Sequence, residues 1–237
     1  PKLQEIGLAN VRVLELGAGM GHFTAMLIAA GVSPENIVCT DYSDFGRQQI
    51  ARLGATALAK DYSELTPADL PGPIHVACLF QVLEHLDNPH AVLARFAELG
   101  VEDVMVLAAV PSDKRMAFNE RNGSLLDMPP NHVGRYTRQA FEALARRGGW
   151  QLQALEYEPE GAPPRLKQFV KYRYLREMQE SGTLANRVER MGASPVKSAL
   201  RAGLGLAYTA THLPAAAKLA TAGELGNSQW VKLSRTG

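Results

Sequence analysis

The chain has 237 residues, of which 46% are hydrophobic and 21% are charged. These proportions are typical of a globular protein with a buried core, and they exclude a disordered chain, a collagen-like repeat and a coiled coil. The net charge of +1 is a cancellation, because residues 1–134 carry nine basic and sixteen acidic side chains, or −7, and residues 135–237 carry sixteen and eight, or +8. The length predicts one α/β-sized domain with an elaboration.

The two cysteines and an uncharged stretch near the C-terminus indicate the cellular compartment of the protein. Cys39 and Cys78 lie in apolar, strand-like stretches without metal-ligand spacing, so we expect buried thiols in a reducing cytoplasm. We expect no signal peptide at the start of the sequence. Residues 202–217 are uncharged but rich in Ala and Gly, and His212 and Pro214 interrupt them, so we expect no membrane span here.

Short apolar runs alternate with helical patterns along the first two thirds of the chain. The expected strands are residues 11–16, 37–40, 56–59, 75–80, 104–110 and 150–157. The expected helices are residues 22–30, 43–54, 88–99 and 137–147, with a polar loop over 111–135. Residues 160–225 then place apolar side chains at helical spacing, and residues 229–233 form a last short strand.

This alternation predicts an α/β fold, in which helices cover both faces of a parallel sheet. We expect a core over residues 1–159, a helical insert or lid over 160–225, and a last core strand within 226–237. A ligand of such a sheet lies beyond the carboxyl ends of the strands. The residues expected there are Gly17–Gly21, Asp41, Asp61, 81–85 and 111–135.

A glycine-rich loop joins the first expected strand to the first expected helix. Its sequence is Glu15-Leu16-Gly17-Ala18-Gly19-Met20-Gly21, which lets the backbone pass close to a ligand at the positive end of a helix. A dinucleotide-binding G-x-G-x-x-G motif would need Gly or Ala where this chain has His22. The spacing G-x-G-x-G, with an acidic residue two positions before the first Gly, resembles motif I of the class I S-adenosylmethionine-dependent methyltransferases. A bare glycine turn and a nicotinamide site are the alternatives.

The resemblance implies a Rossmann-like, seven-stranded, mostly parallel sheet and a set of cofactor-binding residues. Asp41 ends the second strand, where a carboxylate can accept hydrogen bonds from both ribose hydroxyls. Asp61 follows the third strand, as the acidic residue that contacts the adenine amino group does in the family. The residues alone also allow a helix N-cap at Asp41 and an ordinary loop at Asp61. The full set is Glu15, Gly17, Ala18, Gly19, Gly21, Asp41, Tyr42, Asp61, Tyr62, Gln81 and Val82.

Two later segments extend the resemblance to residues 11–157 and the last strand. Residues 80–89, FQVLEHLDNP, resemble a segment of the small-molecule branch of the family, which includes ubiquinone-biosynthesis O-methyltransferases and many sugar and natural-product enzymes. Residues 129–137, PPNHVGRYT, resemble a Pro-Pro-x-His-x-x-Arg-aromatic segment that precedes the last core helix in bacterial members. Residues 160–225 show no such resemblance.

His85 and His132 are the predicted catalytic residues. A hydroxyl acceptor loses a proton as it attacks a methyl group, and an imidazole that titrates near neutrality suits that task. Each has a structural alternative, since His85 could pack at the start of a helix and His132 could fasten its loop. Some ubiquinone-type relatives hold a metal with a Glu-x-x-Glu-His segment, but here Gln81 replaces the first Glu, so no metal site is predicted.

The basic insert has three interpretations. It could be a cap that buries one helix face, a lid whose cations face an anionic acceptor such as a phosphorylated or nucleotide-linked molecule, or a surface that contacts an anionic membrane at its periphery. No nucleic-acid partner is expected, because the basic residues are not interleaved with exposed aromatic residues for stacking. The cations considered for the lid are Arg165, Lys167, Lys171, Arg173 and Arg176.

The sequence thus predicts a cytoplasmic enzyme that uses S-adenosyl-L-methionine to methylate a small-molecule acceptor. We expect a hydroxyl of a sugar, a natural product or a cell-envelope precursor, so that the reaction is O-methylation. The alternatives are N- or C-methylation on the same fold, a nicotinamide-dependent oxidoreductase, and a non-catalytic cofactor-binding protein. His22 argues against the oxidoreductase, because it breaks the dinucleotide-binding glycine pattern.

Overall fold

The chain forms two compact units. The computed structural model describes residues 5–99, 105–121, 125, 127–158, 161–221 and 226–235. Unit 1 consists of Pro1–Pro111, His132–Glu156 and Gln229–Gly237, and unit 2 consists of Ser112–Asn131 and Tyr157–Ser228.

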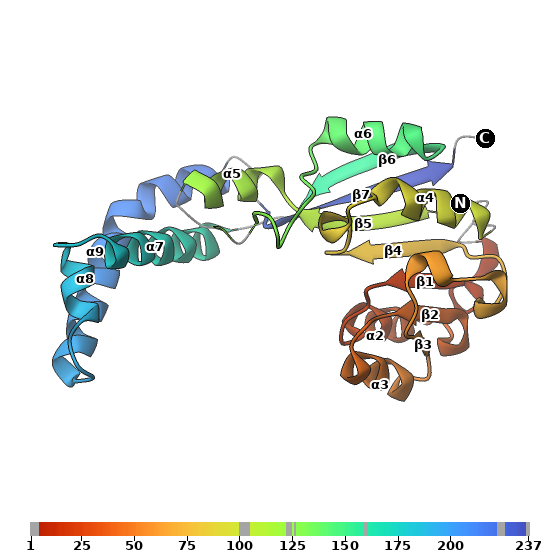
Figure 1. The fold of residues 1–237 in the computed structure, drawn as a ribbon, viewed down its shortest axis with the longest axis horizontal. Helices are drawn as coiled ribbons and strands as arrows, with labels where there is room; N and C mark the ends of the chain where they lie inside the picture. The colour runs from red at the N-terminus through yellow and green to blue at the C-terminus, as the bar shows by residue number, and fades with distance from the viewer. Residues whose placement is uncertain are drawn as a thin grey trace. The chain divides into compact units, whose positions relative to one another are not determined.

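Unit 1 is built on a seven-stranded sheet with the order β3-β2-β1-β4-β5-β7-β6. The registers of β1 to β5 are parallel, and β7 runs against its neighbours (Figure 1). This arrangement confirms the predicted Rossmann-like, mostly parallel sheet. The strands are β1 (Val13–Leu16), β2 (Ile37–Thr40), β3 (Thr56–Leu58), β4 (Val76–Phe80), β5 (Met105–Pro111), β6 (Trp150–Tyr157) and β7 (Ser228–Arg235).

Helices cover both faces of this sheet. Because successive strand residues point to opposite faces, Val13 and Leu14 of β1 join two different apolar clusters. Ile50 of α3 packs in the cluster of Val13, and Phe96 of α4 and Phe141 of α6 pack in the cluster of Leu14. The helices of unit 1 are α2 (His22–Ala29), α3 (Asp44–Arg52), α4 (Pro89–Glu98) and α6 (Arg138–Arg147), with short 3-10 turns η1 (Leu8–Asn10), η2 (Pro34–Asn36), η3 (Tyr62–Glu64), η4 (Pro67–Asp69) and η5 (Leu83–His85).

Unit 2 is helical, as predicted for residues 160–225. It contains α5 (Asp113–Arg121), α7 (Ala162–Gln179), α8 (Leu184–Glu189) and α9 (Pro195–Thr221), and α7 lies along α9 (Figure 1). Tyr172 of α7 and Tyr208 of α9 are buried, and the Arg173 guanidinium lies 4.3 Å from the centre of the Tyr208 ring. Within the described residues, no helix is both long and apolar enough to cross a bilayer.

The prediction of a loop over residues 111–135 was wrong in part, because this segment contains α5. The helix has mostly polar side chains, so it lacks the apolar periodicity on which the prediction rested. Ser112 begins it, since its Oγ accepts a hydrogen bond from the Arg115 N–H at 3.0 Å. Asp127, 2% exposed, then accepts hydrogen bonds from Arg115 and Asn119. Polar pairing therefore packs this helix.

Candidate functional site

The glycine loop lies between β1 and α2, at the carboxyl end of the sheet. Gly17 and Gly19 have φ angles of 66° and 56°, in the left-handed region that other residues rarely adopt. A Cβ on Gly17 would lie 2.6 Å from Cγ2 of Val82, whereas a Cβ on Gly19 would meet nothing within 4 Å. Gly17 thus permits close packing against the loop after β4, and Gly19 leaves open space above the backbone.

Glu15 lies beneath this loop rather than in the open space. Its side chain is 3% exposed, and Oε2 accepts a hydrogen bond of 2.9 Å from the Thr24 hydroxyl on α2. Burial raises the pKa of Glu15 from 4.5 to about 7, against the opposing effect of the Thr24 hydrogen bond. The contact joins β1 to α2 and so holds the loop from below. Its assignment as a cofactor residue stays a prediction.

Asp41 connects the end of β2 to the glycine loop. Its Oδ2 accepts the Gly19 N–H at 2.7 Å, and its Oδ1 accepts the Ser43 N–H at 2.8 Å. A carboxylate has about four lone-pair positions. Each oxygen of Asp41 therefore keeps an acceptor position for a diol such as a ribose.

Tyr42 and Asp61 form the neighbouring wall of the same site. The Tyr42 hydroxyl donates a hydrogen bond of 2.9 Å to Asp61 Oδ2. Partial burial acts to raise the pKa of Asp61, but hydrogen bonds from Ser63 and Tyr42 outweigh it and lower the pKa, so this carboxylate is ionised at neutral pH.

A pocket lies where these elements meet. Ala18, Gly19, Gly21, Gln81 and the buried Glu15 are not among its wall residues. Four wall residues were not among the predicted site residues, although Lys60 directly precedes the predicted Asp61; they are Leu16, Thr40, Lys60 and Leu86. Lys60 is held by Asp69, with 2.6 Å between Nζ and Oδ1. The wall residues are Leu16, Gly17, Thr40, Asp41, Tyr42, Lys60, Asp61, Tyr62, Val82 and Leu86.

Gln81 has an unusual backbone at the end of β4. Its φ angle is 58°, and within the part of the chain that the structure describes no other non-glycine residue has a positive φ. Its N–H donates a hydrogen bond of 2.7 Å to the Ala109 carbonyl of β5. Such backbone strain concentrates at functional sites. This turn sends the next residue, Val82, into the wall of the pocket.

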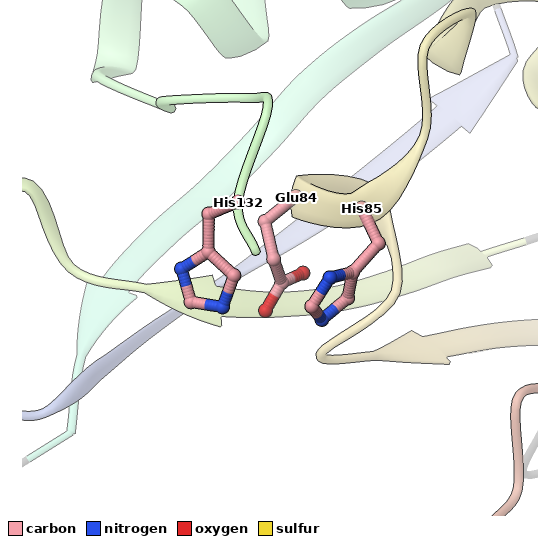
Figure 2. A group of neighbouring side chains, drawn as sticks. All are labelled: Glu84, His85 and His132. Carbon is pink, nitrogen blue, oxygen red and sulfur yellow. The ribbon is translucent and has the colours of Figure 1, made fainter. Parts of the chain in front are cut away.

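The two predicted catalytic histidines lie together beside Glu84. The ring centres of His85 and His132 are 4.9 Å apart, and one ligand atom each of Glu84, His85 and His132 lies within 4.8 Å of the others (Figure 2). Glu84 is 1% exposed and His132 is 9% exposed, whereas His85 is exposed. Glu84 and His85 belong to η5, which lies in the sequence between Val82 and Leu86 of the pocket wall.

Backbone hydrogen bonds explain how residues so far apart in the sequence meet. The N–H groups of Val133 and Gly134 donate to the Glu84 carbonyl at 2.8 and 3.0 Å. The Tyr136 hydroxyl donates to the Leu83 carbonyl at 3.1 Å, and burial, with the nearby Glu84 carboxylate, raises the pKa of Tyr136 to about 12. The loop that carries His132 is thereby fixed to η5.

This cluster has the chemistry of a proton-transfer site and also that of a metal site. Two imidazoles can accept a proton and a buried carboxylate can stabilise the resulting cation. One carboxylate and two imidazoles are also ligands that zinc and other transition metals accept. The expectation that no metal binds rested on Gln81 and did not consider His132 as a ligand, and it stays a prediction.

A parallel sheet with a glycine loop after β1, a carboxylate at the end of β2 and a pocket at their carboxyl ends defines an enzyme fold of the nucleotide-cofactor class. Residues 2–155 match the family model of the methyltransferase domain, and the chain belongs to this family. It is a class I methyltransferase, and S-adenosylmethionine is its cofactor. The resemblance seen in the sequence is confirmed.

Solved structures share the fold at low sequence identity. A SAM-dependent methyltransferase from Archaeoglobus fulgidus is 11% identical, with 97% of this chain and 88% of that chain covered and a TM-score of 0.56. An S-adenosylmethionine-dependent methyltransferase from Mesorhizobium loti is 14% identical, with 99% and 96% covered and a TM-score of 0.56. A cyclopropane synthase from Mycobacterium tuberculosis is 12% identical, with 98% and 82% covered and a TM-score of 0.55. No curated protein matches the sequence.

Proposed function

We propose that this methyltransferase methylates a hydroxyl group of a small molecule, with His85 and His132 at the acceptor. The observation that carries the proposal is the cluster of Glu84, His85 and His132 beside the pocket wall. An oxygen nucleophile must lose a proton in the reaction, and this cluster can take it. The same fold also supports N- and C-methylation, so the fold does not determine the acceptor atom. We choose oxygen because of the chemistry of this cluster.

S-adenosylmethionine supplies an electrophilic methyl group on a positively charged sulfur. Asp41 and Asp61 bind the nucleoside part, and the glycine loop lets it approach the start of α2. One imidazole then accepts the proton of the acceptor hydroxyl, while the Glu84 carboxylate stabilises the imidazolium. The site would accelerate transfer of that methyl group by aligning the acceptor oxygen with it.

We further propose that the acceptor is anionic, that the enzyme acts in the cytoplasm and that it contacts a membrane. An anionic acceptor is supported by residues 161–221, which carry ten Lys and Arg side chains against three Glu, a net charge of +7. A cytoplasmic site of action is supported by Cys39 and Cys78, both of which are free and buried. Membrane contact through these helices is the third feature, and it is supported by the exposed apolar side chains of α9.

Transfer of a labelled methyl group into a metabolite extract tests the proposal. We expect label in a small molecule and, after isolation, a methyl ether in that product. Label on nitrogen or carbon would contradict O-methylation while leaving methyl transfer intact. A chain that binds S-adenosylmethionine but transfers no label to any acceptor would contradict the catalytic role of the cluster.

A further inference from the structure

Helix α9 exposes large apolar side chains along one side. Val196, Leu200, Leu206 and Leu213 are 59%, 38%, 73% and 52% exposed. At the period of the α-helix these four positions fall within an arc of about 140°. On the opposite side, Tyr208 is buried. We call the side defined by these four exposed residues the α9 face.

The middle of helix α9 carries no charged side chains, whereas its ends carry cations. Helix α9 contains no Asp or Glu, and between Ala202 and Ala217 it contains no Lys or Arg either. Lys197 and Arg201 precede that stretch, and Lys218 follows it. The helix thus presents an uncharged apolar face with cations towards both ends, so apolar contact and attraction to anionic lipid can act together on it.

The acidic residues within residues 161–221 offset these cations only in part. Glu189 is paired with Lys197 and Arg201 at 3.2 and 3.1 Å, and Glu177 with Arg173 at 2.8 Å. The net charge of residues 161–221 is +7, so the remainder of the chain carries −6. The excess positive charge therefore belongs to the helices that carry the apolar face. The exposed cations of these helices are Lys167, Lys171, Arg176, Arg187, Arg190, Arg201 and Lys218.

We propose that the α9 face docks on the surface of an anionic phospholipid bilayer, with the helix lying in the plane of the interface. A bilayer of this kind offers hydrocarbon to the leucines and negative charge to the surrounding cations. A second copy of the chain would bring another +7 to the same place, which opposes self-association through this face. A nucleic acid would meet the cations but would leave the apolar side chains without a favourable contact.

This docking rests on the membrane contact in the proposed function and makes it specific, but it is independent of methyl transfer, since it needs neither cofactor nor acceptor. We therefore expect the complete chain to sediment with vesicles of phosphatidylglycerol and phosphatidylcholine in equal parts, in the absence of S-adenosylmethionine. Binding to pure phosphatidylcholine should be weaker by about tenfold or more, because it lacks the electrostatic attraction. Added salt should weaken binding to the anionic vesicles.

Single substitutions on the face separate docking from folding. Leu206→Asp and Leu213→Asp change exposed side chains, so the far-UV circular dichroism should be unchanged. Each should lower the affinity for anionic vesicles about tenfold or more, because a carboxylate replaces an apolar contact beside anionic lipid. Leu8→Asp is the matched control, since Leu8 is an exposed leucine of unit 1, and its vesicle affinity should equal that of the natural chain.

Three outcomes would overturn the proposal. They are no sedimentation with the anionic vesicles, equal affinity for Leu206→Asp and the natural chain, and a dimer in light scattering that Leu206→Asp dissociates. The last would show that the face pairs two copies. Cofactor binding, measured on the same variants by calorimetry, shows separately whether the methyltransferase site is intact.

Discussion

The two units differ in how their sequence relates to their function. In unit 1 we propose that the backbone itself approaches the cofactor, for which Gly17 and Gly19 adopt positive φ angles and Asp41 accepts the Gly19 N–H. These requirements leave a local pattern in the sequence. In unit 2 the constraints are burial, charge and helical periodicity, which many sequences satisfy. A site is therefore predictable from sequence where it depends on backbone geometry.

The largest effect is expected from Gly19→Val, which tests whether the backbone of unit 1 is the binding surface. The new side chain would occupy the open space above Gly19 and strain a φ of 56°. We expect binding of S-adenosylhomocysteine, measured by calorimetry, to fall below detection. Gly149→Val is the matched control, because Gly149 has a φ of 76° and its Cβ would also meet nothing within 4 Å. A variant Gly19→Val of normal affinity would place the cofactor elsewhere.

The next effect concerns the cluster of Glu84, His85 and His132. We expect His85→Ala and His132→Ala to lower the turnover number, because the variant lacks an imidazole that accepts the proton of the acceptor hydroxyl. The larger of the two losses should be about 10²–10⁴-fold. Cofactor affinity should change little, since neither histidine lines the pocket. His90→Ala serves as the control, since His90 bonds to Arg147 on the surface of unit 1. Full turnover by both cluster variants would show that alignment alone drives the reaction.

The sequence predicted the centre of the sheet well because β1 and β2 are buried on both faces. Four residues of β1 and four of β2 are all buried, so an unbroken apolar run marks each strand. Helix α5 was missed because Asp127 packs it through hydrogen bonds with Arg115 and Asn119. Asp127 lies outside the helix, so the spacing of apolar residues within α5 gives no sign of this contact.

The candidate site was predictable only in part. The residues of the pocket wall that follow a strand, such as Asp41 and Asp61, have a fixed place in the alternation of strands and helices. His85 and His132 could be named as single candidates, but their contact depends on Val133 and Gly134 donating to the Glu84 carbonyl. Such a long-range backbone contact has no counterpart in one sequence.

Glu15 allows a test of the buried support beneath the loop. Its pKa is about 7 in the folded chain and 4.5 as the ordinary value, so the folded state holds the proton more tightly. The stability that this provides is present below pH 4.5 and is lost as the pH rises through 7. Chemical denaturation of Glu15→Gln should not show this loss, which is worth about 3 kcal/mol. If the free energy of unfolding of both chains changed equally between pH 5 and 8, the raised pKa of the buried Glu15 carboxyl would be contradicted.

Asp41→Ala has a smaller expected effect, confined to the cofactor. It removes the acceptors for the ribose hydroxyls and for the Gly19 N–H, which should weaken cofactor binding by about 1–3 kcal/mol. Calorimetry measures the change directly. Asp44→Ala is the control, because Asp44 lies three residues further on and pairs with Arg47 at an exposed position. Equal losses in the two variants would indicate a general effect of charge in place of ribose binding.

The smallest effect tests whether the two units act independently. Burial, with the neighbouring Glu177, raises the pKa of Tyr208 to about 12, so its hydroxyl stays protonated and donates to Glu177. Tyr208→Phe keeps the ring under Arg173 and removes only that hydrogen bond, which should cost about 0.5–1.5 kcal/mol of stability in thermal unfolding. Cofactor affinity should be unchanged, because every residue of the pocket wall belongs to unit 1. A loss of affinity in this variant would mean that the packing of α7 on α9 is coupled to the cofactor site, and the separation of the two units in function would then fail.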